Sequence, residues 1–153
     1  MHSLEHRIPP PVLTLIVAIC MGLVAHSTAA LNISPMLRYV LTGIFLVGGG
    51  LIGPPAFGAF NRAGTTINPV DIEKASALVT TGVYRFTRNP MYIGLTALLL
   101  ALAAFFGNAW AAFGPMFFAL FITRFQIIPE ERVMTAKFGQ AYLDYTARVR
   151  RWL

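Results

Sequence analysis

Residues 89–123 read NPMYIGLTALLLALAAFFGNAWAAFGPMFFALFIT, a stretch of 35 residues without Lys, Arg, Asp or Glu. As one continuous helix it is about 52 Å long, because a helix rises about 1.5 Å per residue. A bilayer-spanning helix needs about 20 apolar residues, so the stretch is either one overlong span or two short ones. Gly107 and Asn108 interrupt it near the middle, which favours a hairpin of two short helices.

Two further charge-free runs precede this stretch, at residues 8–37 and 39–61. The chain has 153 residues, of which 56% are hydrophobic and 12% charged, and its mean hydropathy is +0.65. These values exclude a water-soluble doubly wound domain, an ordinary soluble enzyme core and a disordered chain, because none of these keeps such long runs free of charge.

The predicted fold is all-α: a polytopic integral membrane helical bundle of about four spans, the last two forming a helical hairpin, with a C-terminal amphipathic helix. The whole chain, 1–153, is predicted to be a single membrane domain. Its predicted segments are span 1 at 8–31, span 2 at 36–58, a cytoplasmic loop at 59–88, span 3 at 89–106, span 4 at 109–128 and an interfacial helix at 129–150.

The charges indicate an orientation. Twelve Lys and Arg residues stand against six Asp and Glu residues, for a formal net charge of +6. With four spans, every Lys and Arg except Arg38 lies on one side of the bilayer, and such an excess marks the cytoplasmic face. We therefore expect a multi-pass protein of a bacterial inner membrane with both termini in the cytoplasm. Anionic lipid headgroups account for most of the cations, so the bilayer is an expected partner and nucleic acid is not.

The N-terminal run also has features of a secretory signal peptide, since Arg7 precedes it and residues 28–30 are small. It continues beyond the usual length of a signal, which favours a membrane span. Cys20 is the single cysteine, so no disulfide within the chain is predicted. The histidines do not form a convincing ligand set, and no metal site is predicted; they are His2, His6 and His26.

Residues 48–53, GGGLIG, match the G-x-G-x-x-G pattern of dinucleotide-binding turns, with Asp71 downstream. That pattern binds a dinucleotide when it follows a strand and opens a helix, whereas these glycines lie inside a predicted span. We interpret Gly49 and Gly53 instead as a close contact with another membrane helix. Residues 54–55, both proline, are expected to kink or end the span.

Residues 78–94 read LVTTGVYRFTRNPMYIG. Gly82 supplies a turn, Arg85 and Arg88 place two cations at the membrane surface, and Asn-Pro begins the next helix. A helix N-terminus beside two arginines is suited to hold an anion such as a carboxylate. The alternative, which composition alone favours, is a helix start with basic anchors and interfacial tyrosines.

Residues 129–152 read PEERVMTAKFGQAYLDYTARVRRW. Glu130 and Glu131 follow the hairpin directly and lie at the same interface as the arginines. The first turn of a helix favours acids, which gives them a structural role, yet acids at a membrane interface are also candidates for function. An apolar stripe of helical period follows, so this helix lies on the membrane or folds over the site; the stripe is Val133, Met134, Phe138, Tyr142 and Tyr145.

Together the two segments resemble the isoprenylcysteine carboxyl methyltransferase family, to which the phospholipid N-methyltransferases are related. The pattern is L-V-T-x-G-x-Y-x-x-x-R-N-P-M-Y-x-G, then, after a hydrophobic hairpin, E-E and F-G-x-x-Y-x-x-Y with a basic C-terminus, over residues 76–152. The resemblance implies an integral membrane methyltransferase. Such an enzyme takes S-adenosyl-L-methionine at the cytoplasmic face and a lipophilic acceptor, prenylcysteine-like or phospholipid-like, from the bilayer.

By position, the resemblance implies a set of cofactor-binding residues: Ser76, Ala77, Leu78, Val79, Tyr84, Asn89, Pro90, Met91, Tyr92 and Glu130. Acidic, aromatic and amide groups suit the ammonium, adenine and carboxylate of the cofactor. The prenylcysteine enzymes have histidine in place of Asn89, and they have an arginine, thought to face the substrate carboxylate, in place of Gln126. Gln126 and the nearest cation, Arg124, are accordingly the predicted substrate-binding residues.

In methyl transfer from a sulfonium, the side chains mainly have to hold the acceptor in line with the methyl group in a pocket without water. No catalytic residue is therefore predicted, although Glu130 or Glu131 is a candidate acceptor for the proton of an amine substrate. The third and fourth spans are expected to form a lipid tunnel. Candidates for its wall, for which packing or lipid contact is the alternative, are Phe105, Phe106, Phe117, Phe118, Phe121 and Phe125.

Two other functions stay open. One is a membrane scaffold in which Asn89 and Gln126 mark a degenerate site, against which the retained Tyr84, Tyr92 and Glu130 argue. The other is an NADPH-dependent enzyme like the sterol reductases, which share a related C-terminal architecture but are expected to have more spans. Binding of S-adenosylmethionine or of NADPH separates these functions.

Overall fold

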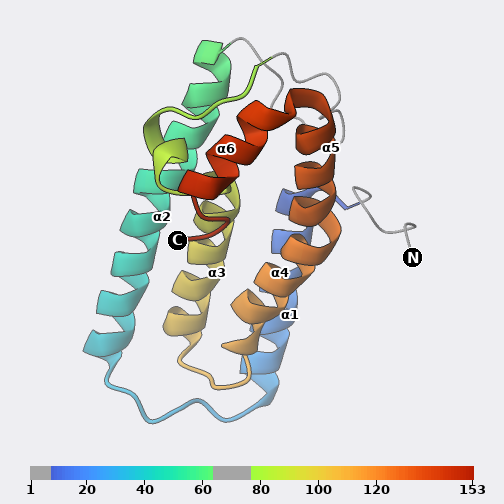
Figure 1. Ribbon diagram of the computed structural model, residues 1–153. Helices are drawn as coiled ribbons and strands as arrows, with labels where there is room; N and C mark the ends of the chain where they lie inside the picture. Colours follow the sequence, from blue (N-terminus) through green and yellow to red (C-terminus); the bar gives the residue numbers. More distant parts are fainter. Residues whose placement is uncertain (1–7, 64–76) are drawn as a thin grey trace.

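The computed structural model describes residues 8–63 and 77–153, and this part of the chain is helical, without a named strand (Figure 1). The long elements are α1 (Pro10–Ser27), α2 (Pro35–Ala63), α3 (Pro90–Phe106) and α4 (Phe113–Ile122). The shorter ones are the 3-10 helix η2 (Gly82–Arg85), the π-helical turn η3 (Thr123–Ile127), α5 (Ile128–Phe138) and α6 (Gln140–Arg148). The all-helical prediction is confirmed for the described residues.

The four long helices run side by side along the molecule, and α6 turns back across one end of the bundle (Figure 1). The helix α4 continues through η3 into α5 without a break. The inner faces of α1, α3 and α4 meet in one apolar core. Its buried members are Leu13, Val17, Met21, Tyr92, Leu99, Ala111, Phe118, Ile122 and Ile127. The buried residues of α1 recur every three to four positions, so they share one face of the helix, as expected of a helix packed on one side.

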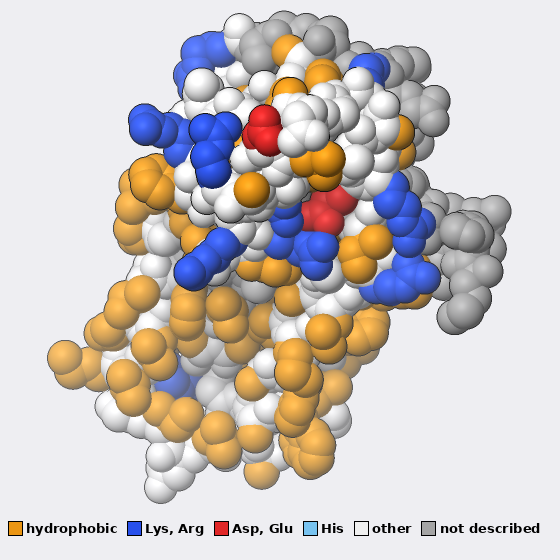
Figure 2. Space-filling view, in the orientation of Figure 1, with side chains coloured by type: hydrophobic (Ala, Val, Ile, Leu, Met, Phe, Trp, Pro, Cys, Tyr) orange, Lys and Arg blue, Asp and Glu red, His pale blue; other side chains and the backbone are white. Residues whose placement is uncertain are grey.

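The outer surface of the bundle is apolar. Helix α1 and residues 35–59 of α2 are each long and apolar enough to cross a membrane. Leu15, Leu23 and Leu51 are 61%, 65% and 69% exposed. On the face that Figure 2 shows, side chains of this kind gather over the body of the molecule, whereas most charged side chains gather at the end formed by α5, α6 and the C-terminus. An apolar exterior of this extent is suited to lipid rather than to water, and it identifies a membrane protein.

Helices α2 and α3 pack closely through glycine. A Cβ atom added to Gly49 would lie 2.9 Å from the Cβ of Ala97, and one added to Gly94 would lie 3.0 Å from the Cα of Gly53. Small residues allow two helix backbones to approach in this way. The interpretation of Gly49 and Gly53 as a helix contact is confirmed, and the partner is α3.

Replacing Gly49 with leucine is expected to destabilise the fold by about 1–3 kcal/mol, because the added side chain must push α3 away from α2. Thermal unfolding of the detergent-purified variant measures this loss. Gly50→Leu is the matched control, since a Cβ added to Gly50 meets no atom within 4 Å. Equal unfolding temperatures for the two variants would contradict the close contact.

The turn between α3 and α4 depends on Gly107 and Asn108. Gly107 ends α3 with φ 56°, a left-handed conformation that favours glycine. The side chain of Asn108 is buried, donates to Thr28 Oγ1 at 2.8 Å, and accepts from the Trp110 amide at 2.9 Å. This asparagine therefore joins the α3–α4 turn to the end of α1.

Two local expectations differ from the structure. Residues 54–55 were expected to kink or end the span, and the helix does not end there: α2 continues to Ala63. The last turns of α2 pack Ala56 and Ala59 against Val79 and Tyr84. The single helix expected at 129–150 is two helices, α5 and α6. Gly139 separates them with φ 51° and ψ −126°, a conformation that side-chain-bearing residues rarely adopt.

Candidate functional site

A polar cavity lies at the charged end of the bundle, with a volume of about 100 Å³. It is formed by the segment around η2, the start of α3, and the helices η3, α5 and α6. The lining residues are Ala77, Val79, Tyr84, Arg88, Asn89, Ile127, Glu130, Glu131, Met134 and Tyr142. Two acids and one arginine therefore share a small space with apolar and aromatic side chains.

Glu130 is the acid with neutral partners. The Tyr92 hydroxyl donates to Glu130 Oε1 at 2.6 Å, and Gln126 Nε2 donates to the same oxygen at 3.1 Å. Burial raises the pKa of Glu130 to about 7, although both hydrogen bonds act to lower it and the neighbouring Glu131 acts to raise it. Near neutral pH this carboxyl group is therefore poised to bind a cation or to take up a proton.

Glu131 is the acid with charged partners. Arg151 forms a two-point contact with it, Nε to Oε1 at 3.0 Å and Nη2 to Oε2 at 2.7 Å. Arg88 Nη2 lies 3.0 Å from Glu131 Oε1. The pairing with two guanidinium groups gives Glu131 a structural role. The buried Nε of Arg88 has no hydrogen-bond partner among the described residues, which leaves one donor for a ligand.

The end of the chain, residues 149–153, lies along the segment before α3, and we name it the C-terminal strap. The Arg88 amide donates to the Arg150 carbonyl at 2.9 Å. Asn89 Nδ2 donates to the Arg151 carbonyl at 2.9 Å, and Thr87 Oγ1 to the same oxygen at 3.3 Å. The Asn89 side chain thus holds the strap and is already engaged at the edge of the cavity.

Three tyrosines complete the enclosure. The Tyr145 hydroxyl donates to the Tyr84 carbonyl at 2.7 Å, which fixes α6 over η2. Burial raises the pKa of Tyr84 and of Tyr145, and it raises the pKa of Tyr142 to about 12. These hydroxyl groups therefore stay neutral at physiological pH. Of the two arrangements expected for the C-terminal segment, α6 adopts the one that folds over the site.

The structure brings five predicted cofactor residues to the cavity: Ala77, Val79, Tyr84, Asn89 and Glu130. Tyr92 and Gln126 reach it through their hydrogen bonds to Glu130. Leu78, Pro90 and Met91 neighbour these residues in the chain but do not line the cavity. Ser76 lies outside the described residues.

Arg124, a predicted substrate residue, is placed on η3 away from the cavity lining, with its guanidinium 5.3 Å from the centre of the Phe125 ring. Five lining residues were not predicted to bind the cofactor: Arg88, Ile127, Glu131, Met134 and Tyr142. Ile127, Glu131 and Met134, together with Glu130, follow one another at the three- and four-residue spacing that places side chains on one helix face. That spacing is the signal from which they could have been found.

Replacing Glu131 with glutamine is expected to loosen the C-terminal strap and to cost about 3–5 kcal/mol of stability, because Arg88 loses its anionic partner while its side chain is only 13% exposed. Hydrogen exchange of the Arg88 amide, which donates to the strap, measures the loosening. Asp144→Asn, which removes an exposed carboxylate from α6, serves as the control. Unchanged protection in Glu131→Gln would contradict the role of this acid.

Comparisons with known proteins identify the relatives of the chain. The family model for phospholipid methyltransferases matches residues 37–141. An uncharacterized protein of Haemophilus influenzae is 44% identical over 63 residues, which are 41% of this chain and all of that protein. Protein-S-isoprenylcysteine O-methyltransferase A of Arabidopsis thaliana is 32% identical over 109 residues, 69% of this chain and 54% of the plant enzyme.

The chain thus spans about half the length of the plant relative. The comparison with solved structures gives no match. The family model covers more than two thirds of the chain, including η2, the start of α3 and the two glutamates. The chain therefore belongs to the phospholipid methyltransferase family, which is related to the isoprenylcysteine carboxyl methyltransferases.

Proposed function

We propose that the protein transfers a methyl group from S-adenosyl-L-methionine to a lipophilic acceptor, prenylcysteine-like or phospholipid-like, at the cytoplasmic face of a membrane. The observation that carries this proposal is the polar cavity around Glu130, formed by the segments that the family shares. The buried Glu130, which accepts hydrogen bonds from Tyr92 and Gln126 at the edge of this cavity, supports a binding site rather than a scaffold alone.

The residues around the cavity fit the cofactor part by part. Its ammonium group needs an anion, which Glu130 supplies, and its carboxylate needs a donor, which the unpartnered Nε of Arg88 offers. Apolar and aromatic walls are supplied by Ile127, Met134 and Tyr142. Sites for whole small molecules occupy about 300–1,000 Å³. A cavity of about 100 Å³ therefore receives the amino-acid end of the cofactor.

The chemistry then needs orientation more than acid or base catalysis. When bound, S-adenosylmethionine would supply a methyl carbon activated by positive sulfur, and its remainder would leave as S-adenosylhomocysteine. Glu130 and Arg88 orient the two charged ends of the cofactor, and Tyr142 helps to exclude water.

The proposed arrangement in the membrane has four spans, at 8–31, 36–58, 89–106 and 109–128, with both termini in the cytoplasm. Arg38 lies beside the α3–α4 turn and donates through Nε to the Phe105 carbonyl at 3.1 Å, at the end of the bundle away from α6. The charged end around α5 and α6 in Figure 2 then faces the cytoplasm, in agreement with the positive-inside rule. A bacterial inner membrane is the proposed location.

Calorimetric titration of the detergent-purified protein with S-adenosylhomocysteine tests the proposal. We expect micromolar binding that is lost in Glu130→Ala and weakened in Tyr92→Ala, with no binding of NADPH. Asp144→Asn, an exposed acid on α6, is the control that keeps binding. Absence of binding to folded wild-type protein would overturn the proposal, and binding of NADPH instead would favour a reductase. Label transfer to phosphatidylethanolamine vesicles or to farnesylcysteine then identifies the acceptor class.

A further inference from the structure

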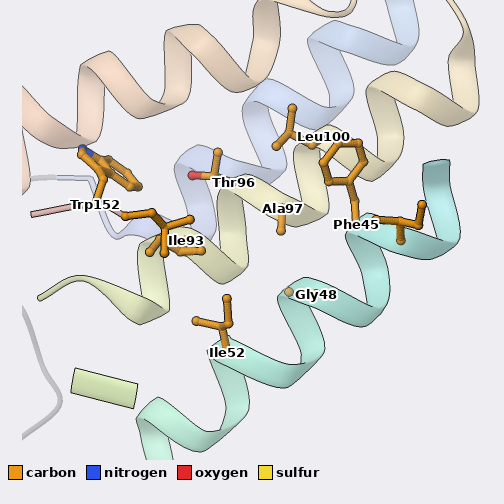
Figure 3. A pocket seen from close by; sticks show the side chains of 11 residues that line it. Phe45, Gly48, Ile52, Ile93, Thr96, Ala97, Leu100 and Trp152 are labelled. Carbon is orange, nitrogen blue, oxygen red and sulfur yellow. The ribbon is translucent and has the colours of Figure 1, made fainter. Parts of the chain in front are cut away.

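A second cavity, with a volume of about 350 Å³, lies between α2 and α3 (Figure 3). We name it the α2/α3 groove. Most of its lining is apolar, and Thr96 and two glycines of α2 complete it. The lining residues are Ile44, Phe45, Gly48, Gly49, Ile52, Ile93, Thr96, Ala97, Leu100, Trp152 and Leu153. The Thr96 hydroxyl donates to the Tyr92 carbonyl of its own helix at 2.8 Å, so it leaves no donor for a polar ligand.

Figure 3 shows how the groove is bounded. Phe45 and Leu100 lie at one end, and Trp152 and Ile93 lie at the other. Gly48 provides the floor on α2, where the lack of a side chain leaves space. This groove is not the lipid tunnel that was expected between the third and fourth spans. The groove lies between α3 and α2, and the phenylalanine that lines it is Phe45. None of the phenylalanines proposed for that tunnel lines it.

The C-terminal strap joins the groove to the polar cavity. Arg151 pairs with Glu131 in the lining of the cavity, and the next residue, Trp152, lines the groove. The indole N–H of Trp152 donates to Thr123 Oγ1 at 3.2 Å, which fixes the ring. One strap residue therefore contacts a residue that lines the polar cavity, and the next strap residue lines the apolar groove.

Resting on the proposed function, we propose that one hydrocarbon chain of the acceptor lies in the α2/α3 groove, and that Trp152 is a specificity-determining residue at the end of the groove that adjoins the polar cavity. A hydrocarbon chain fits because the lining is apolar and both walls are helices with a lipid-facing exterior. A charged acceptor head at the Trp152 end lies beside the strap, where the methyl donor's cavity begins.

Gly48→Leu tests the occupant, because a Cβ added to Gly48 meets no atom within 4 Å and the leucine side chain enters the groove without disturbing a helix contact. Gly50→Leu is the matched control: it is two residues away, equally free of neighbours and absent from the lining. We expect Gly48→Leu to raise the KM for the acceptor about tenfold or more, with kcat and S-adenosylhomocysteine affinity unchanged within about twofold.

A second readout does not depend on methyl transfer. Trp110 and Trp152 are the two tryptophans, so Trp110→Phe leaves Trp152 as the only tryptophan, and its emission is excited apart from that of the tyrosines. In vesicles of phosphatidylcholine with brominated acyl chains, a chain in the groove quenches Trp152. We expect Gly48→Leu, added to this background, to reduce the quenching by about half, and Gly50→Leu to leave it unchanged. Equal quenching in both variants would overturn the proposal.

The role of Trp152 has its own variants. Trp152→Ala opens the end of the groove and is expected to change the preference among acceptor chain lengths, seen in KM, while Trp152→Phe, which keeps a ring, retains the wild-type preference. An unchanged preference in Trp152→Ala would contradict the assignment. S-adenosylhomocysteine that fails to bind the wild type and every variant would overturn the proposed methyl transfer. A quenching difference that is still present in that case would show that the groove nevertheless holds a lipid chain.

Discussion

Replacing Glu130 with glutamine is expected to weaken the binding of S-adenosylhomocysteine by about 30- to 100-fold at about pH 7.5. An ionised carboxylate in a buried site contributes about 2–3 kcal/mol to holding an ammonium group, and a neutral amide cannot replace that charge. Glutamine still accepts a hydrogen bond from the Tyr92 hydroxyl, which lies 2.6 Å from Glu130 Oε1 in the native protein. The loss therefore reports the charge rather than the shape of the side chain.

The same variant is expected to remove the pH dependence of binding. Burial raises the pKa of Glu130 to about 7, and a cationic ligand binds the ionised form. In the wild-type protein the affinity therefore rises about tenfold per pH unit as pH increases toward 7 and levels off above it. Glutamine has no proton to lose, so its weaker affinity stays constant from about pH 5.5 to about 7.5, where the ligand's amino group remains charged.

The control for these titrations is Asp144→Asn, which removes an exposed carboxylate from α6 and is expected to leave both affinity and pH profile unchanged. Thermal unfolding above pH 7 separates binding from folding, because removing a charge that burial disfavours leaves the stability of Glu130→Gln equal to that of the wild type or higher. A pH profile that persists in Glu130→Gln would assign the titration to another group.

Local sequence patterns were sufficient for part of this site. Glu130 could be placed near the interface because it follows shortly after the 35-residue uncharged stretch 89–123. Gly49 and Gly53 could be interpreted because a spacing of four residues places both glycines on one helix face. In each case the informative residues lie within two turns of one helix, so the period alone determines which face they share.

The remainder depends on contacts that no local pattern contains. Asn89, which was predicted to bind the cofactor, lines the cavity, and its side chain also donates to the Arg151 carbonyl, 62 residues away. The separate roles of the adjacent glutamates follow from Arg88 and Arg151, which converge on Glu131 from distant segments. The apolar period predicted a single C-terminal helix. The structure has two, because Gly139 adopts a positive φ that cannot be predicted from composition alone.

Substitutions at Gln126 are expected to move the pH profile of cofactor binding in opposite directions. Gln126 is 4% exposed, and its Nε2 donates to Glu130 Oε1 at 3.1 Å. This hydrogen bond lowers the pKa of Glu130 against the effect of burial. In Gln126→Met the donor is lost with little change of shape, so the pKa rises further and the midpoint of the binding profile moves above pH 7. In Gln126→Arg a cation replaces the amide, and the midpoint moves down by about 1–3 pH units.

Titration of both variants with S-adenosylhomocysteine between about pH 5 and about pH 8 measures these midpoints. The opposite signs matter because a disturbance of packing at this buried position would weaken binding at every pH without moving the midpoint. Midpoints that stay in place in both variants, with weaker binding at every pH, would show that position 126 acts through packing and would contradict the prediction. Midpoints that separate as expected would establish that the residue at position 126 sets the charge of Glu130, and that glutamine there keeps this acid able to change its protonation state near neutral pH.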